Sequence, residues 1–142
     1  MMGEAVLQPS PVESDQKNAQ KRILVVDEDA NSREGLRRWL VADGHIVETA
    51  GDGWQAIRKM KESRFDIAII DLDLPAVRGV GVNGWDLARI SRAYHPAISI
   101  IMIGSETGRA VNMQLEALKV SEFLEKPISP GHLKLLVRQI EQ

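Results

Sequence analysis

Five short apolar runs, separated by amphipathic segments, constrain the fold of this chain more than any other feature of the sequence. The strongest runs are apolar almost throughout, whereas strands with one solvated face alternate apolar and polar residues. Continuous runs are typical of strands that a parallel sheet buries on both faces, so five strands are predicted. The runs, of which the second is the weakest, are Ile23–Val26, Ile46–Val47, Ile67–Ile70, Ile98–Ile103 and Phe123–Leu124.

Apolar residues recur with helical spacing between and after these runs, which predicts five helices. Asn31 or Ser32 is expected to be the N-cap of the first helix, and Asp52 that of the second, because such side chains accept hydrogen bonds from free backbone N–H groups. Strands that alternate with helices predict an α/β fold, a doubly wound five-stranded parallel sheet flanked by five helices. Right-handed crossovers leave few topologies open.

Length and composition fit one globular domain, since the chain has 142 residues. Residues 1–20 are polar, contain two prolines and lack a hydrophobic period, so they are expected to form a disordered leader. Residues 21–142 are expected to form the folded domain.

Charge and cysteine content exclude several classes of protein. The 18 basic and 20 acidic residues give a net charge of −2, which supplies no electrostatic argument for direct nucleic-acid binding or for an anionic membrane surface. Without cysteine, disulfides, thiolate catalysis and cysteine metal sites are excluded. No run approaches the ~20 apolar residues of a membrane span. The N-terminus lacks the pattern of a secretion signal, so a cytoplasmic location is expected.

Charged residues follow several of the predicted strands at the edge where α/β sheets bind ligands. Asp27 and Glu28 follow the first strand, Asp71 and Asp73 the third, and Lys126 the fifth. Two carboxylates about 4 Å apart repel by roughly 4 kcal/mol at an effective dielectric near 20, so a cation is expected among them. Mg²⁺ suits a few carboxylates with waters and a phosphate oxygen, and lysine adds a compact positive charge. Such a group indicates phosphoryl transfer, which depends on positioning and charge neutralisation.

Three segments resemble the receiver domains of bacterial response regulators, the phosphoacceptors of two-component signalling. They are ILVVDED (Ile23–Asp29), IAIIDLDLP (Ile67–Pro75) and LEKP (Leu124–Pro127), in which an Asp lies four residues before a Pro and a Lys precedes another. The resemblance covers about residues 22–141 and implies a flavodoxin-like fold similar to that of chemotaxis regulators, with strand order 2-1-3-4-5.

The resemblance also implies roles for individual residues. Asp71 corresponds to the phosphoacceptor, which takes a phosphoryl group from a histidine kinase in a Mg²⁺-dependent reaction without being a turnover enzyme. Asp27 and Glu28 correspond to the acidic pair that holds Mg²⁺ together with Asp71, directly or through water. Asp73 lies where the family supplies a backbone carbonyl to the metal, so its side chain need not take part.

Lys126 corresponds to the lysine that contacts the phosphoryl group, and Lys126–Pro127 to a cis peptide. The family's switch hydroxyl, usually Thr or Ser, falls on Gly104 here, and Ser105 follows it. Either Ser105 takes over that role or the hydroxyl-coupled switch is weakened. Phe123 fills the position of the family's aromatic partner and offers no hydroxyl.

The loop after the third strand is a second departure from the family pattern. About five extra residues separate Pro75 from Asn83–Gly84, and the resulting loop Ala76–Asn83 contains two glycines. It either shapes partner access and the lifetime of the acyl phosphate or is a tolerated surface insertion.

Partners implied by the resemblance are a histidine kinase or phosphotransfer protein, and either a downstream protein target or an output domain missing from this chain. A homodimer is compatible with it. Two other interpretations remain open. One is an interaction module that keeps the fold without phosphorylation, which Gly104 favours. The other is a haloacid-dehalogenase-type phosphatase, which also uses two Asp residues spaced like Asp71 and Asp73, but on its first strand.

Residues outside these motifs are expected to be structural. His45, His95 and His132 show no ligand spacing and are expected at the surface. Met102 and Met113 are expected in the core.

Overall fold

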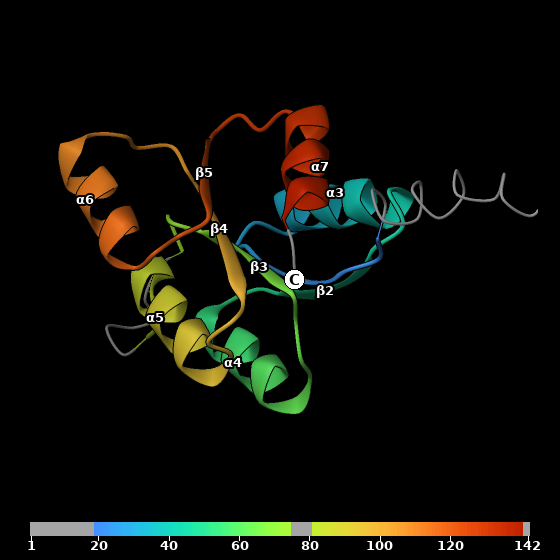
Figure 1. Cartoon of the computed structure of the whole chain (residues 1–142), viewed down its shortest axis with the longest axis horizontal. Helices are drawn as coiled ribbons and strands as arrows, with labels where there is room; N and C mark the ends of the chain where they lie inside the picture. Colours follow the sequence, from blue (N-terminus) through green and yellow to red (C-terminus); the bar gives the residue numbers. More distant parts are fainter. Residues whose placement is uncertain (1–18, 75–80, 141–142) are drawn as a thin grey trace, which may run out of the picture.

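The computed structural model describes residues 19–74 and 81–140 and contains a five-stranded parallel sheet flanked by helices (Figure 1). The strand order is β2-β1-β3-β4-β5, which confirms the predicted topology. The strands are β1 (Arg22–Val26), β2 (Ile46–Ala50), β3 (Ile67–Asp71), β4 (Ser99–Gly104) and β5 (Glu122–Glu125). The helices are α3 (Ala30–Ala42), α4 (Gly53–Glu62), α5 (Gly84–Tyr94), α6 (Arg109–Ala117) and α7 (Pro130–Gln139).

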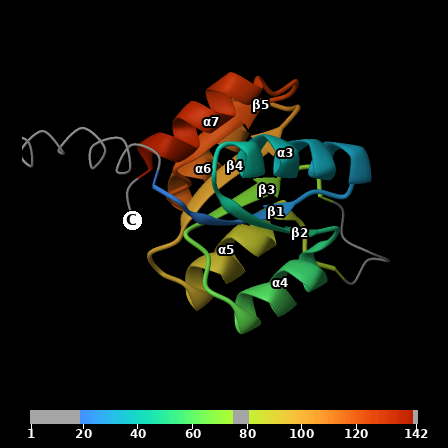
Figure 2. The same ribbon diagram turned by 90° about the vertical axis from the view of Figure 1, so that its right-hand side faces the viewer.

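Helices cover both faces of the sheet, as Figure 2 shows, with α3 and α7 on one side and α4 and α5 on the other. Successive residues of a strand point to opposite faces, so each continuous apolar run feeds two cores. In β1, Ile23 and Val25 pack with Leu40 of α3 and Val137 of α7. Leu24 and Val26 of the same strand pack with α4 and α5. Burial on both faces explains why these runs are apolar throughout.

Short polar side chains cap the N-terminus of every described helix except α6, whose N-cap is a glycine. Asp29 is the N-cap of α3 and accepts a hydrogen bond from the Ser32 backbone N–H, so the predicted caps Asn31 and Ser32 were wrong by two or three residues. Asp52 caps α4 as expected, by accepting from the Gln55 N–H. At α5, Asn83 caps the helix, and a reciprocal capping box satisfies two free N–H groups.

A buried polar cluster joins the start of β1 to the end of α7, at the edge of the sheet opposite the carboxyl ends. The Lys21 ammonium donates to the Val137 carbonyl oxygen at 2.6 Å, and its backbone N–H donates to His45 Nδ1 at 3.1 Å. Arg138 pairs with Asp43 through two hydrogen bonds. The His45 ring is fully buried, so the expectation that it lies at the surface was wrong. His95 is half-buried against the Met60 carbonyl oxygen, and His132 is exposed as expected.

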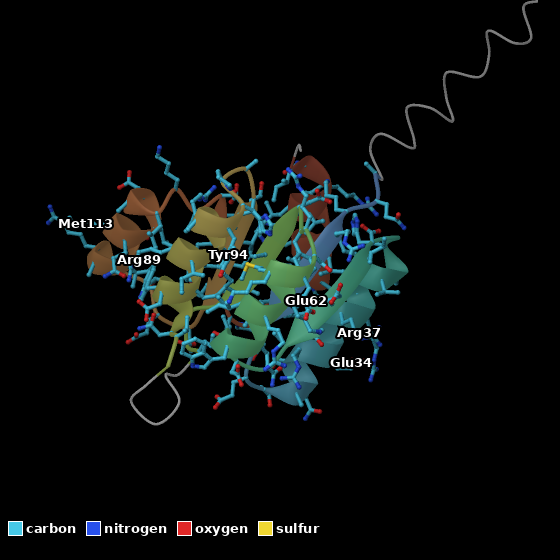
Figure 3. All side chains as sticks on the ribbon, turned by 90° about the horizontal axis from the view of Figure 1, so that it is seen from below. Glu34, Arg37, Glu62, Arg89, Tyr94 and Met113 are labelled. Atoms are coloured by element: carbon cyan, nitrogen blue, oxygen red, sulfur yellow. The ribbon has the colours of Figure 1, made fainter. Side chains whose placement is uncertain are left out.

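Helix α6 contributes no buried residue, unlike the other four helices of the described chain. Leu115 of this helix and Leu118, its C-cap residue, are only partly buried against the α4–α5 core. Met113 is 62% exposed, and Figure 3 shows it pointing away from the body of the protein. Its predicted core position was therefore wrong, whereas Met102 of β4 is fully buried as predicted.

Two expected segments fall largely outside the described residues. These are the leader at residues 1–20 and the loop Ala76–Asn83, of which only residues 19–20 and 81–83 are described. In the second segment, Val82 is buried, and its side chain lies where a side chain on Gly53 of α4 would have to go. Every helix within residues 19–74 and 81–140 is too short or too polar to span a bilayer.

Candidate functional site

Asp71 is the last residue of β3, which lies in the middle of the sheet between β1 and β4. Val26 at the end of β1 is in register with Ile70, so Asp27 emerges beside Asp71. Both carboxyl residues are nearly buried, with exposed fractions of 4% for Asp27 and 5% for Asp71. Two acids that the sequence separates by a whole βαβα segment are thus brought together by the parallel pairing.

Backbone amides hold one oxygen of each of these two carboxylates. The Asp73 N–H donates to Asp71 Oδ1 at 2.8 Å, and the Asp29 N–H donates to Asp27 Oδ1 at 2.9 Å. In both cases the donor lies two residues after the acid, a local turn that Asp side chains favour. The same device therefore fixes the rotamers of Asp27 and Asp71 at the ends of two adjacent strands.

Lys126, which follows β5, reaches the other oxygen of Asp71. Its Nζ lies 3.0 Å from Asp71 Oδ2 and 3.4 Å from Asp73 Oδ2. The Ser105 hydroxyl donates to the same Asp73 oxygen at 3.1 Å. The Lys126 N–H donates to the Gly104 carbonyl oxygen at 2.9 Å, and the Lys126–Pro127 peptide is cis. Side chains from three strand ends thus meet in one hydrogen-bonded group.

Burial and charge shift the pKa values of the two groups on either side of Asp71. Burial raises the pKa of Asp27 to about 6, and the Asp71 carboxylate adds to the rise, against the Asp29 N–H and Lys126, which lower it. Burial lowers the pKa of Lys126, but its hydrogen bond to Asp71 and the charges of Asp71 and Asp73 raise it overall. Lys126 is therefore a cation near neutral pH, in a site with an excess of negative charge.

Asp27 and Asp71 place two nearly buried carboxylates side by side, which is an arrangement that can bind a metal ion. Among the described residues, no three acidic or histidine side chains form a ready-made cation cage. Mg²⁺, however, is usually held by one or two carboxylates, with waters and phosphate oxygens completing its shell. Lys126 offsets one negative charge and lowers the pKa of Asp27, but this pKa remains raised to about 6. Two adjacent carboxylates with uncompensated charge fit Mg²⁺.

Two other predicted site residues, Glu28 and Gly104, lie at or near this edge of the sheet and differ in their contacts. Glu28 is exposed, and in the described part of the chain its carboxylate forms no hydrogen bond or ion pair. Gly104 is buried at the end of β4, where an added Cβ would lie 3.1 Å from Leu72 Cβ and 3.4 Å from the Phe123 ring. The space of the missing side chain is thus occupied by Leu72 and Phe123.

Three contacts at the site escaped the sequence analysis. The Asp73 side chain, expected to be uninvolved, pairs with Lys126. Arg33 of α3, which belongs to none of the sequence motifs, donates to the Asp27 carbonyl oxygen at 2.7 Å. Gly84, the first residue of α5, lies so close to β3 that a Cβ there would be 2.8 Å from the Asp71 carbonyl oxygen. Each contact depends on how the chain folds back on itself after a strand, which local sequence patterns do not reveal.

A groove of about 300 Å³ opens next to the site, between α3 and the segment after β5. Asp27 and Lys126 contribute to its lining, while Leu36, Trp39 and Ile128 give it an apolar wall. The charged groups of the site are therefore reached from an apolar surface.

Comparison with known proteins identifies the family to which this site belongs. The family model of the response regulator receiver domain matches residues 23–138. The chain belongs to this family. Its members are the phosphoacceptor domains of two-component signalling rather than turnover enzymes, and phosphorylation and Mg²⁺ binding are characteristic of them. The family assignment therefore favours neither the phosphatase interpretation nor the phosphorylation-independent module.

Individual relatives agree with this assignment. The DNA-binding response regulator MtrA of Mycobacterium tuberculosis is 36% identical over 119 residues, which cover 83% of this chain and 49% of MtrA. The receiver domain thus spans about half the length of the curated relatives it matches.

Solved structures show the same fold. The chemotaxis protein CheY4 of Vibrio cholerae is 29% identical, with a TM-score of 0.76 over 86% of this chain and 100% of that one. The response regulator TrrA of Thermotoga maritima, solved in complex with Mg²⁺-BeF, is 28% identical, with a TM-score of 0.72 over 84% of this chain and 97% of that one. The predicted flavodoxin-like receiver fold is confirmed.

Proposed function

We propose that Asp71 accepts a phosphoryl group from the phosphohistidine of a histidine kinase or phosphotransfer protein. An oxygen of the Asp71 carboxylate attacks phosphorus, the P–N bond breaks, and its electron pair leaves with the imidazole nitrogen. The observation that carries this proposal is the pairing of the nearly buried Asp71 with Lys126 at 3.0 Å, beside the second buried acid Asp27. Phosphoryl transfer requires such positioning and charge neutralisation more than it requires covalent chemistry from the protein.

Each neighbour of Asp71 has a part in this reaction. Asp27 and Asp71, with Glu28 through water and the Asp73 carbonyl oxygen, are the proposed ligands of Mg²⁺. The bound ion supplies positive charge that offsets the crowded carboxylates and the phosphoryl oxygens. Lys126 already contacts Asp71 and needs only to follow the added charge onto a phosphoryl oxygen. The Asp73 N–H keeps the Asp71 carboxylate oriented during the attack.

The phosphorylated state is proposed to bias the surface around α6 and β5. Ser105 is the nearest hydroxyl that can donate to a phosphoryl oxygen, since Gly104 has none. Phe123 packs beside Gly104 on β5, so it is placed to follow a movement of this strand end. Helix α6, with no buried residue, is the helix of the described chain that can shift at the lowest cost in core packing.

The wider setting is proposed on the same basis. Residues 21–142 act as the receiver, residues 1–20 as a leader, and the loop Ala76–Asn83 as a segment that affects access to Asp71. The domain works in the cytoplasm, alone or as a homodimer. Its target is a downstream protein or an output domain encoded beyond this sequence, and it does not itself contact nucleic acid or membrane.

The groove walled by Leu36, Trp39 and Ile128 suits an apolar helix of the phosphodonor. Hydrolysis of the acyl phosphate by water resets the domain.

Incubation with acetyl phosphate and Mg²⁺, followed by intact-mass measurement, tests the proposal. The wild-type chain is expected to gain one phosphoryl group, and Asp71→Asn to gain none. Glu62→Gln, an exposed acid on α4, is the matched control and is expected to react like the wild type. Equal labelling of Asp71→Asn and wild type would show that another residue is the acceptor.

A further inference from the structure

The β4–α6 loop is tied to the phosphoacceptor strand by a contact that the family role of the site does not include. Ser105, the first residue after β4, donates its hydroxyl hydrogen to Asp73 Oδ2 at 3.1 Å. Lys126 Nζ lies 3.4 Å from that same oxygen while it contacts Asp71 Oδ2 at 3.0 Å. One carboxylate oxygen of Asp73 thus holds both the loop and the lysine.

The packing next to this contact explains why the loop is held through Ser105 and not through the residue before it. A Cβ on Gly104 would lie 3.1 Å from Leu72 Cβ and 3.3 Å from Leu72 Cδ2, closer than side chains ordinarily approach. Leu72 in turn is fixed, because its backbone N–H donates to the Ile103 carbonyl oxygen at 2.6 Å. The Leu72 side chain therefore fills the space that a side chain at position 104 would need.

We propose that the Asp73 carboxylate and the Ser105 hydroxyl form a latch that holds the β4–α6 loop against the unphosphorylated site. The Leu72 side chain packs beside this hydrogen bond and fills the space at position 104, so that only glycine fits there. This inference rests on the proposed function of Asp71 as phosphoacceptor and names the resting-state contact from which the switch starts.

Charge provides the means of release. A carboxylate carries one negative charge, whereas an acyl phosphate carries close to two near neutral pH and adds three acceptor oxygens. Lys126, shared between Asp71 and Asp73 in the resting state, follows the larger charge at Asp71. Asp73 then loses its cation and faces a new anion, while Ser105 gains a stronger acceptor at Asp71. The Ser105–Asp73 hydrogen bond breaks as a result, and the loop moves with it.

Hydrogen–deuterium exchange of the full chain, with and without beryllofluoride and Mg²⁺, tests the latch at the amides of residues 105–109. In Ser105→Ala, exchange of these amides in the resting state is expected to rise by about two- to tenfold, the range for loss of one net hydrogen bond. With beryllofluoride bound, Ser105→Ala is expected to exchange faster than the wild type as well, because it lacks the hydroxyl in both states. Asp73→Ala, which removes only the resting acceptor of Ser105, is expected to exchange like the wild type once beryllofluoride is bound. Ser105→Thr keeps the hydroxyl and is expected to restore slow exchange, whereas Glu106→Gln, an exposed acid next to Ser105, is expected to change nothing.

A double-mutant cycle tests the packing of Leu72 at position 104 by urea denaturation. Gly104→Ser alone is expected to destabilise the domain, and Leu72→Ala is expected to reduce that penalty by at least about half when the two are combined, since it frees the space at position 104. Additive effects would overturn the packing part of the inference.

Outcomes of the exchange experiment separate the latch from the function on which it rests. Unchanged resting exchange in Ser105→Ala, while beryllofluoride still alters the wild-type loop, would overturn the latch and leave Asp71 as the acceptor. Beryllofluoride effects that persist in Asp71→Asn would instead overturn the proposed function.

Discussion

Gly84 provides the sharpest test of how the phosphoacceptor strand is positioned. A Cβ at Gly84 would lie 2.8 Å from the Asp71 carbonyl oxygen and 3.0 Å from Leu72 Cα, both backbone atoms that no rotamer change can move. In Gly84→Ala, the start of α5 and the Asp71–Leu72 peptide must therefore move apart. Overpacking of this kind costs about 1–3 kcal/mol, of which the better helix propensity of alanine returns less than about 1 kcal/mol.

Gly35 offers a matched control for the same substitution. It lies inside α3, and nothing lies within 4 Å of the position that its Cβ would take. Gly35→Ala is therefore expected to stabilise the domain by about 0.5–1 kcal/mol, through helix propensity and a less flexible unfolded chain.

Urea denaturation followed by circular dichroism measures both effects. With a slope of about 1–3 kcal/mol per M urea, the midpoint of Gly84→Ala is expected to fall by up to about 3 M and that of Gly35→Ala to rise by up to about 1 M. Phosphorylation by acetyl phosphate should also slow in Gly84→Ala, because the displaced peptide carries Asp71. If Gly84→Ala were as stable as Gly35→Ala, the close approach of α5 to β3 would not constrain the site.

Three further predictions concern buried charged groups, and urea midpoints measured against pH check each of them. Burial lowers the pKa of His45, so below about pH 6.5 the unfolded chain binds a proton at this residue that the folded chain does not. The free energy of unfolding should therefore drop as the pH falls below about 6.5, and His45→Asn should abolish this drop. Because the pKa of Asp27 is raised to about 6, its ionised form lowers the stability of the fold above that pH. Without Mg²⁺, Asp27→Asn should therefore raise the free energy of unfolding by on the order of 1–3 kcal/mol near neutral pH and by much less near about pH 4. Lys21→Met should cost about 1 kcal/mol or more, because the Val137 carbonyl oxygen loses its donor; a neutral effect would mean that water replaces the ammonium.

The sheet could be predicted from the sequence because its strands are buried on both faces. Ile67–Ile70 has no polar interruption, and the structure buries all four residues of this run. Acids after such runs necessarily fall at one edge of a parallel sheet, which is why Asp27 and Asp71 could be placed near each other before any coordinates. The fold and the centre of the site thus follow from local patterns combined with one topological rule.

Errors arose where a residue's environment is set by segments far away in the sequence. His45 was expected at the surface, but it is buried beside Lys21, whose ammonium reaches the Val137 carbonyl oxygen of α7, and neither of these residues lies near it in the chain. Met113 shares a helical apolar period with other residues of α6, yet this helix lies at the margin of the sheet and buries none of them. Asp29 directly follows Asp27 and Glu28 in the sequence, but its side chain caps α3. An Asp at a strand end and an Asp at a helix start look alike in sequence when the two elements are this close.

Backbone N–H groups hold the site together as well as side chains, and the sequence does not reveal these backbone contacts. One oxygen of Asp71 is held by the Asp73 N–H, one of Asp27 by the Asp29 N–H, and Lys126 is held through its own N–H by the Gly104 carbonyl oxygen. Such contacts constrain φ, ψ and space but not the type of the donor residue. The side chain at position 73 is therefore free to take on a further role, and the Asp73 carboxylate can bind Ser105 without disturbing the amide that orients Asp71. The Asp73 N–H thus orients Asp71 for the reaction, while the Asp73 carboxylate holds the β4–α6 loop. Because two different groups do this, the loop can be released without loss of the contact that orients Asp71.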